Sequence, residues 1–293
     1  MTVEELLEKA ARPRKLASPY HKFYGGKLQV MPKVAIRTVR DFDLWYTPGV
    51  AQPCREIEKA PELAYEYTNK WNQVAIVSDG TRVLGLGDIG GLAGLPVMEG
   101  KAILFKYLGG VDAFPLCLNT KDPDEIVKVC KLIEPTFGGI NLEDISKPKC
   151  FYVLEKAREE LDIPVWHDDQ QGTATVVLAG VINALKSVGK KLDEVLISII
   201  GVGSANTRGA IVLERAGVNM KNIMMVDSKG ILNPNRKDIE AIKEKEPHKW
   251  NFCLKTNAEG RIGGIAESLK DVDVCIAASR PGPGFPLVLQ YAQ

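Results

Sequence analysis

The sequence predicts an α/β fold with two domains, each built on a parallel β-sheet covered by helices. The 293-residue chain is longer than one typical domain, so two domains are expected. Between residues 70 and 170, short apolar runs alternate with helical patterns, which is typical of parallel strands joined by crossover helices. A second series of this kind begins with a fully apolar strand that leads directly into a glycine turn.

The elements of the first series follow one another in a regular order. We expect strands at residues 74–77, 113–118, 139–142 and 163–166, because these runs are apolar and short. Helical patterns separate them at residues 97–107, 124–133 and 151–161. Strands in such units are buried on both faces by their helices.

The second series begins after a long helix at residues 173–186. Apolar strands follow at residues 195–200, 223–227 and 272–278. The change of pattern places a domain boundary between residues 170 and 190, and we divide the chain into residues 1–172 and 173–293.

Composition excludes some classes of function. A net charge of +1 and a hydrophobic content of 45% describe an ordinary globular protein, without a global field that favours nucleic acid or membrane. The first ten residues resemble an acidic amphipathic helix, and no apolar run reaches membrane-spanning length. We therefore expect a cytoplasmic protein. The six widely spaced cysteines form no CxxC pair and are interpreted as reduced thiols: Cys54, Cys117, Cys130, Cys150, Cys253 and Cys275.

The glycine turn of the second series is a candidate dinucleotide site. It joins a buried strand to a helix, where glycines let the backbone approach a pyrophosphate and the helix N-terminus offers N–H groups. We assign this role to Gly201, Gly203, Ser204 and Ala205. Asn206 replaces the third glycine of the usual fingerprint, so an ordinary tight turn is the alternative.

Asp227 ends the next strand, 26 residues after Gly201, where an acid binds the adenosine ribose. Ser228 and Lys229 beside it could instead accept a 2′-phosphate. The residues thus leave the choice between NAD and NADP open.

Two pairs of carboxylates are candidate metal ligands. Asp168 and Asp169 precede the helix at 173–186, and Glu143 and Asp144 follow the strand at 139–142. Carboxylate oxygens suit a hard ion such as Mg²⁺ or Mn²⁺. The structural alternative for the aspartate pair is a helix cap with a solvated acid at the helix dipole.

Three further residues have both a functional and a structural interpretation. Lys101 lies among apolar residues that could lower its pKa, although a lysine that reaches solvent from a helix is more frequent. Arg82, in a glycine-rich connection, could hold a carboxylate or be a surface arginine. Tyr46 precedes Pro48-Gly49, a pair that predicts a type II turn.

Taken in order, several segments resemble signatures of the malic enzyme family, in its compact bacterial and archaeal type, over roughly residues 18–284. The matching segments are Tyr46-Thr47-Pro48-Gly49-Val50-Ala51, Ser78-Asp79-Gly80, Gly85-Leu86-Gly87-Asp88-Ile89-Gly90, Pro96-Val97-Met98-Glu99-Gly100-Lys101, Gly109-Gly110-Val111-Asp112, Asn141-Leu142-Glu143-Asp144 and His167-Asp168-Asp169-Gln170-Gln171-Gly172-Thr173-Ala174. The family oxidises (S)-malate with NAD or NADP and decarboxylates the resulting oxaloacetate to pyruvate.

The resemblance implies roles for individual residues. It makes Lys101 the base that deprotonates the C2 hydroxyl, with Asp168 tuning that lysine, and Tyr46 the group that protonates the enolate. It makes Arg82 a residue that grips a substrate carboxylate. The metal ligands it implies are Glu143, Asp144 and Asp169. It also implies a homodimer or a larger homo-oligomer.

The C-terminal segment departs from the family pattern. The family continues well beyond the position of Gly284, whereas residues 285–293 match none of its later motifs, so we expect a Rossmann-type domain that is incomplete at its C-terminus. This departure keeps open a dicarboxylate- or metal-binding module without dehydrogenase activity. A Rossmann-type amino-acid dehydrogenase ranks lower, because it leaves both acidic pairs without a role.

Overall fold

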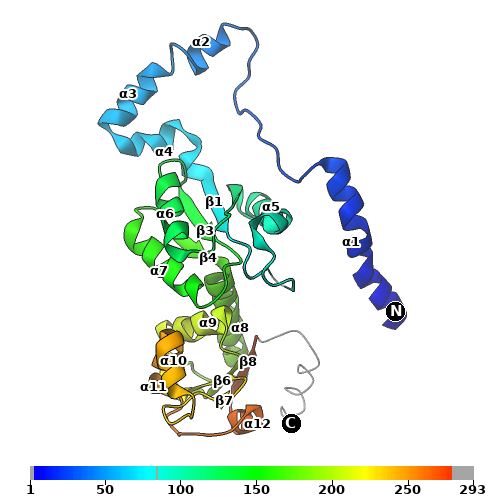
Figure 1. Ribbon diagram of the computed structural model, residues 1–293, viewed down its shortest axis with the longest axis vertical. Helices are drawn as coiled ribbons and strands as arrows, with labels where there is room; N and C mark the ends of the chain where they lie inside the picture. The colour runs from blue at the N-terminus through cyan, green and yellow to red at the C-terminus, as the bar shows by residue number, and fades with distance from the viewer. Residues whose placement is uncertain (1–2, 84, 279–293) are drawn as a thin grey trace. The chain divides into compact units, whose positions relative to one another are not determined.

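The computed structural model describes residues 3–83 and 85–278, which form two compact units (Figure 1). Of the described residues, the first unit holds 3–83, 88–141 and 157–165, and the second holds 85–87, 142–156 and 166–278. The mixed arrangement of helices and parallel strands confirms the predicted α/β class.

The first unit opens with helices before its sheet begins. These are α1 (Val3–Tyr24), α2 (Asp41–Trp45), α3 (Ala51–Lys59) and α4 (Ala64–Tyr67). The four-stranded sheet then has the order β2-β1-β3-β4, with β1 (Gln73–Ser78), β2 (Asp112–Cys117), β3 (Gly139–Leu142) and β4 (Val165–His167). All four strands fall on the predicted apolar runs, and β1 and β2 pair in parallel from Gln73 and Asp112 onward.

Local sequence explains where the helices between these strands begin and end. The helix α5 (Gly90–Gly109) ends at Gly110, whose φ of 70° is the left-handed conformation that favours glycine. The helix α6 (Pro123–Ile133) begins after Asp122, whose carboxylate accepts hydrogen bonds from the next two free backbone N–H groups. The helix α7 (Lys149–Glu160) follows β3.

The second unit is built around the strand order β7-β6-β5-β8. The strands are β5 (Ile197–Ile200), β6 (Ile223–Asp227), β7 (Gly230–Ile231) and β8 (Val274–Ala277). The central strand β5 pairs in parallel with both β6 and β8, while β7 returns antiparallel to β6. The helices are α8 (Thr173–Val188), α9 (Ser204–Arg215), α10 (Ile239–Lys245), α11 (Pro247–Lys255) and α12 (Ile265–Leu269).

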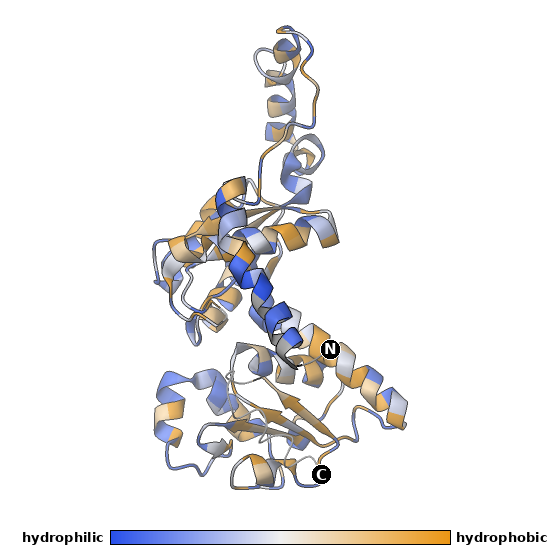
Figure 2. Ribbon diagram, turned by 90° about the vertical axis from the view of Figure 1, so that its right-hand side faces the viewer, coloured by the Kyte–Doolittle hydropathy of each residue, from blue (hydrophilic) through white to orange (hydrophobic). Residues whose placement is uncertain are grey.

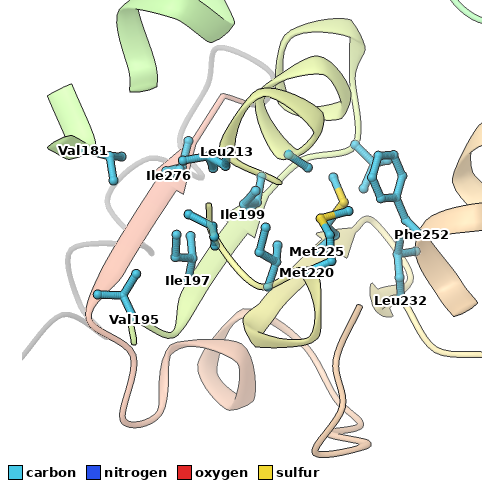
Figure 3. Close-up of a cluster of buried hydrophobic side chains, with 14 of the residues drawn as sticks. Val181, Val195, Ile197, Ile199, Leu213, Met220, Met225, Leu232, Phe252 and Ile276 are labelled. Carbon is cyan, nitrogen blue, oxygen red and sulfur yellow. The ribbon is translucent and has the colours of Figure 1, made fainter. Parts of the chain in front are cut away.

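The core of the second unit gathers on its sheet (Figure 3). Ile197 and Ile199 on β5 pack with Leu213 of α9 and Phe252 of α11, and all four are at most 3% exposed. Figure 2 shows the strands of this sheet in hydrophobic colours. Because all four residues of β5 are buried, the glycine turn after it starts from a firmly packed strand.

One turn prediction is wrong. A type II turn at Pro48-Gly49 needs a left-handed Gly49, but the φ of Gly49 is not positive and the Thr47-Pro48 peptide is cis. Glycine is required there for another reason, since a Cβ would lie 2.6 Å from the backbone oxygens of Asp43 and Leu44. Among the described residues, no helix is long and apolar enough to cross a membrane.

Candidate metal and dinucleotide sites

The acidic cluster lies where two neighbouring strands end. Glu143 and Asp144 directly follow β3, and Asp169 lies in the π-helical turn η3 (Asp168–Gly172) that follows β4. Each residue offers one carboxylate oxygen, and these oxygens all lie within 4.8 Å of one another. Glu143 and Asp144 are buried, at 5% and 4% exposed. Three carboxylates at this distance repel one another, and a cation bound among them would relieve that repulsion.

The donor set fits a hard divalent ion. All three donors are carboxylate oxygens, the ligands that Mg²⁺ and Mn²⁺ prefer. His167 contributes no positive charge, because burial lowers its pKa to about 4. The charge of Arg208 also lowers this pKa, and the charge of Asp168 raises it less than burial lowers it. Its Nδ1 lies 3.8 Å from Oδ2 of Asp169, and the imidazole is neutral at pH 7.

The loop that carries Asp169 is tied to its surroundings by Gln170. The Gln170 side chain is fully buried, donates to the backbone oxygen of Cys150 at 3.0 Å and accepts a hydrogen bond from Arg208 at 3.1 Å. Gln170 therefore connects η3 with α7 and α9. Gln170 lies within the segment His167–Ala174, but no sequence pattern predicted this connecting role.

The two glycines of the turn after β5 have different surroundings, so the absence of a side chain matters for a different reason at each. Gly201 has φ 98°, and a Cβ there would lie 2.6 Å from the backbone oxygen of Ala278. Gly203 has ordinary backbone angles, and nothing lies within 4 Å of the position of a Cβ. Gly203 thus leaves open space at the N-terminus of α9, where a pyrophosphate would approach.

Asn206 takes the place of the third fingerprint glycine without opening the packing. Its buried side-chain amide donates to the backbone oxygens of Ile200 and Gly201 at 2.9 Å, and to that of Ala278 at 3.3 Å. Ile200 and Gly201 lie at the end of β5, and Ala278 follows β8. The Asn206 amide therefore supplies hydrogen-bond donors to carbonyls at the strand ends, which a glycine has no side chain to do. Close packing of helix on strand is achieved by a hydrogen-bonding side chain.

Asp227 ends β6 and is surrounded by donors. It accepts hydrogen bonds from Arg236 at 2.9 Å, Lys249 at 2.8 Å and the backbone N–H of Lys229 at 2.8 Å. Burial by itself would raise the pKa of Asp227, but these hydrogen bonds outweigh burial and lower it. The carboxylate is therefore ionised at neutral pH. Arg236 and Lys249 lie 9 and 22 residues further along the chain, and no local signal pointed to them.

A cavity of about 500 Å³ lies beside Asp227. The residues that line it include Ser228, Lys229, Arg236, Gly263 and Gly264. All the predicted dinucleotide residues thus follow β5 or β6, two adjacent parallel strands, so they meet at one edge of the sheet.

The other predicted site residues have more varied surroundings. Asp168 opens η3, next to the metal cluster. Lys101 lies half-buried on α5, whereas Arg82 and Tyr46 are exposed, Tyr46 at 69%. Lys101, Arg82 and Tyr46 belong to the first unit, and the acidic cluster belongs to the second.

Two family models match the chain one after the other. The model "Malic enzyme, N-terminal domain" matches residues 25–158, and "Malic enzyme, NAD binding domain" matches residues 170–272. An NAD-dependent malic enzyme of Geobacillus stearothermophilus is 48% identical over 88% of this chain and 52% of its own length. A bifunctional malic/malolactic enzyme of Bacillus subtilis is 46% identical over 92% of this chain and 64% of its own length.

Solved structures give the same relationship. The malic enzyme of Pyrococcus horikoshii has a TM-score of 0.84 and 51% identity, covering 91% of this chain and 62% of its own. The NAD-dependent malic enzyme of Thermotoga maritima has a TM-score of 0.84 and 45% identity, covering 90% and 68%. The chain spans about half to two thirds of the length of these relatives. Two family models match in order, and relatives of 45% to 51% identity are covered up to 68%, so the chain belongs to the malic enzyme family.

Proposed function

We propose that this protein oxidises (S)-malate and decarboxylates the product to pyruvate and CO₂, with reduction of NAD or NADP. The observation that carries the proposal is the cluster of Glu143, Asp144 and Asp169, which suits a divalent ion and lies in a chain related to malic enzymes. Several relatives are named as NAD-dependent or NADP-dependent malic enzymes.

In this proposal the first unit supplies the proton-transfer groups. Lys101 takes the proton from the C2 hydroxyl of malate. Asp168, a residue of the second unit, tunes the basicity of that lysine. Tyr46 delivers a proton to C3 of the enolate that remains after CO₂ leaves. Arg82 pairs with a substrate carboxylate, for which its guanidinium fork is suited.

The second unit supplies the binding sites. Glu143, Asp144 and Asp169 would hold Mg²⁺ or Mn²⁺, and the ion would supply Lewis-acid stabilisation of negative charge. Gly201, Gly203, Ser204 and Ala205 take the pyrophosphate of the dinucleotide, and Asp227 takes the adenosine ribose. Ser228 and Lys229 line the cavity beside Asp227. If the cofactor is NADP, these two residues bind its 2′-phosphate.

The proposal extends to organisation and location. We assign the catalytic domain to residues 1–172 and the dinucleotide domain to residues 173–293. We further propose a cytoplasmic protein that acts on small molecules, as a homodimer or a larger homo-oligomer, without nucleic acid or membrane as partner.

The test is malate-dependent formation of NADH or NADPH in the presence of Mn²⁺, with pyruvate measured in the same samples. Equal amounts of reduced cofactor and pyruvate support oxidative decarboxylation. If Mn²⁺ and oxaloacetate bind while no reduced cofactor forms, the chain is a dicarboxylate- and metal-binding module, and the proposal is wrong.

A further inference from the structure

A lysine joins the loop of the metal cluster to the glycine turn of the dinucleotide site. Lys147 lies three residues after Asp144, and its ammonium donates a 3.1 Å hydrogen bond to the backbone oxygen of Val202. Val202 lies between Gly201 and Gly203, where the pyrophosphate of a dinucleotide would approach. We call this contact the lysine bridge, and both of its ends belong to the second unit.

An arginine makes a second connection between the same two sites, also within the second unit. The Nη2 of Arg208 donates a 3.1 Å hydrogen bond to Oε1 of Gln170, the residue after Asp169. Arg208 lies four residues after Ser204, so this arginine bridge ends about one helical turn from the N-terminus of α9. Arg208 and Gln170 are 6% and 0% exposed, and a hydrogen bond from a charged donor is stronger when water is excluded.

Both bridges are held by further contacts. The ammonium of Lys147 lies 3.6 Å from a carboxylate oxygen of Glu246, and the guanidinium of Arg208 lies 3.9 Å from a carboxylate oxygen of Glu155. Gln170 is held from its other side, because its amide donates to a backbone oxygen of α7. A shift of the loops that carry the metal ligands is therefore passed on to the glycine turn and to α9.

This arrangement links the ordering of the two sites. An ion bound among the three carboxylates reduces the freedom of the two loops that carry them, and the bridges extend that ordering to the glycine turn and the first turn of α9. A site that one ligand has already ordered loses less conformational entropy when the second ligand binds, so the second ligand binds more tightly. By thermodynamic linkage the effect has the same size in both directions.

We propose that Lys147 and Arg208 are positioning residues that couple the metal site to the dinucleotide site, so that each ligand tightens the binding of the other. Neither side chain is assigned to contact a ligand. The inference rests on the proposed function, because it requires that one chain binds both a divalent ion and a dinucleotide.

Direct attraction between the ion and the pyrophosphate is the rival explanation of such coupling. That attraction acts through space and needs no bridge, so it persists when a bridge is removed. The positive charges of Lys147 and Arg208 also oppose a bound cation. Loss of such a charge alone strengthens Mn²⁺ binding equally with and without the dinucleotide, and it leaves the ratio of the two affinities unchanged. The ratio therefore separates positioning from charge.

The test measures this ratio by electron paramagnetic resonance. The Kd of Mn²⁺ is determined without NADH and in saturating NADH, and the first value divided by the second is the coupling factor. Lys147→Met and Arg208→Met remove the hydrogen-bond donors and keep an aliphatic side chain. The matched controls are Lys255→Met on α11 and Arg215→Met on α9, both at exposed positions of the same unit.

The wild-type chain and the controls are expected to have a coupling factor of at least about five. Calorimetric titration of NADH with and without saturating Mn²⁺ should give the same factor. Each bridge variant should lower the factor at least about twofold, and the double variant should lower it further. Circular dichroism checks folding. Because the Lys147 side chain is 45% exposed, Lys147→Met decides the test if Arg208→Met does not fold.

The possible contrary results are distinct. If Mn²⁺ and NADH both bind but the coupling factor is one, or if the bridge variants keep the wild-type factor, the inference is wrong and the proposed function stands. If the wild-type chain fails to bind Mn²⁺ or NADH, the proposed function and this inference are both wrong.

Discussion

The backbone N–H of Asp144 donates a 2.9 Å hydrogen bond to Oδ2 of Asp169. This bond joins the loop after β3 to the turn after β4, and it holds two carboxylates of the acidic cluster in one place. Asp144 has φ 54°, in the left-handed region that aspartate tolerates better than most residues. The left-handed backbone at Asp144 thus helps to place the carboxylates of Asp144 and Asp169 next to each other.

Replacement of the lysine tests the base. Lys101→Ala should lower the rate of malate oxidation about 10³-fold, because general bases contribute factors of this order. Binding of Mn²⁺ should not change. Steady-state kinetics and a Mn²⁺ titration measure the two effects, with Lys106→Ala on the same helix as control, because Lys106 forms an exposed ion pair with Asp112. Retained oxidation in Lys101→Ala would remove this lysine from the base role.

Tyr46→Phe should separate proton delivery from metal binding. The variant keeps the ring and loses the hydroxyl, so pyruvate formation from oxaloacetate should fall about 10²-fold, while the affinity for Mn²⁺ stays the same. Tyr20→Phe is a suitable control, since Tyr20 is also exposed, at 56%. If Tyr46→Phe weakened Mn²⁺ binding and turnover equally, the tyrosine would be structural.

The two glycines of the turn after β5 should respond differently to alanine. Gly201→Ala should lower the free energy of unfolding by about 1–3 kcal/mol, because the Cβ meets a carbonyl and φ is positive. Gly203→Ala should change it by less than about 1 kcal/mol, but should weaken dinucleotide binding by about tenfold or more, because the Cβ occupies the approach of the pyrophosphate. Urea unfolding and NADH fluorescence titration measure the two quantities. Unchanged NADH affinity in Gly203→Ala would argue against the dinucleotide site.

Asp227→Asn should be destabilising at neutral pH. The side chains of Arg236 and Lys249 are 7% and 9% exposed, so the variant leaves two buried cations without this anion, at a cost of about 3 kcal/mol. The pKa of Asp227 is lowered from its ordinary value of 3.8. Its stabilisation is therefore complete above about pH 4, and it is lost as the pH falls through the lowered pKa. Urea unfolding of both proteins at pH 7 and at lower pH checks this, and a difference that grew on acidification would contradict it.

Much of the fold could be predicted, because the strands are apolar and short. The bounds of β3 and β6 match the predicted runs, since each run is closed by a polar residue. The strand β7 was missed, because its two residues have no pattern of their own and pair only through the turn after Asp227. The prediction of a type II turn at Gly49 was wrong, because residue preferences of turns do not report how closely another backbone segment approaches the glycine.

The candidate site was predictable where neighbouring residues carry the signal. The acidic pairs Glu143-Asp144 and Asp168-Asp169 follow predicted strands, and strands that are adjacent in a sheet bring such pairs together. The partners of Asp227 could not be predicted, since Arg236 and Lys249 reach it through the fold. The same holds for Gln170 and Arg208, whose hydrogen bond links two segments 38 residues apart.

The most direct test of the central claim is a Mn²⁺ titration followed by electron paramagnetic resonance, on the wild-type chain and on Glu143→Gln. The claim predicts one bound Mn²⁺ per wild-type chain. Loss of a residue that only hydrogen-bonds to a metal ligand weakens metal binding about 10- to 100-fold. Glu143 is proposed as a direct ligand, so Glu143→Gln should lower the affinity for Mn²⁺ by about 100-fold or more. Glu240→Gln, at an exposed position, should bind like the wild type. Equal Mn²⁺ affinity in Glu143→Gln and the wild type, or no binding to either, would contradict the account.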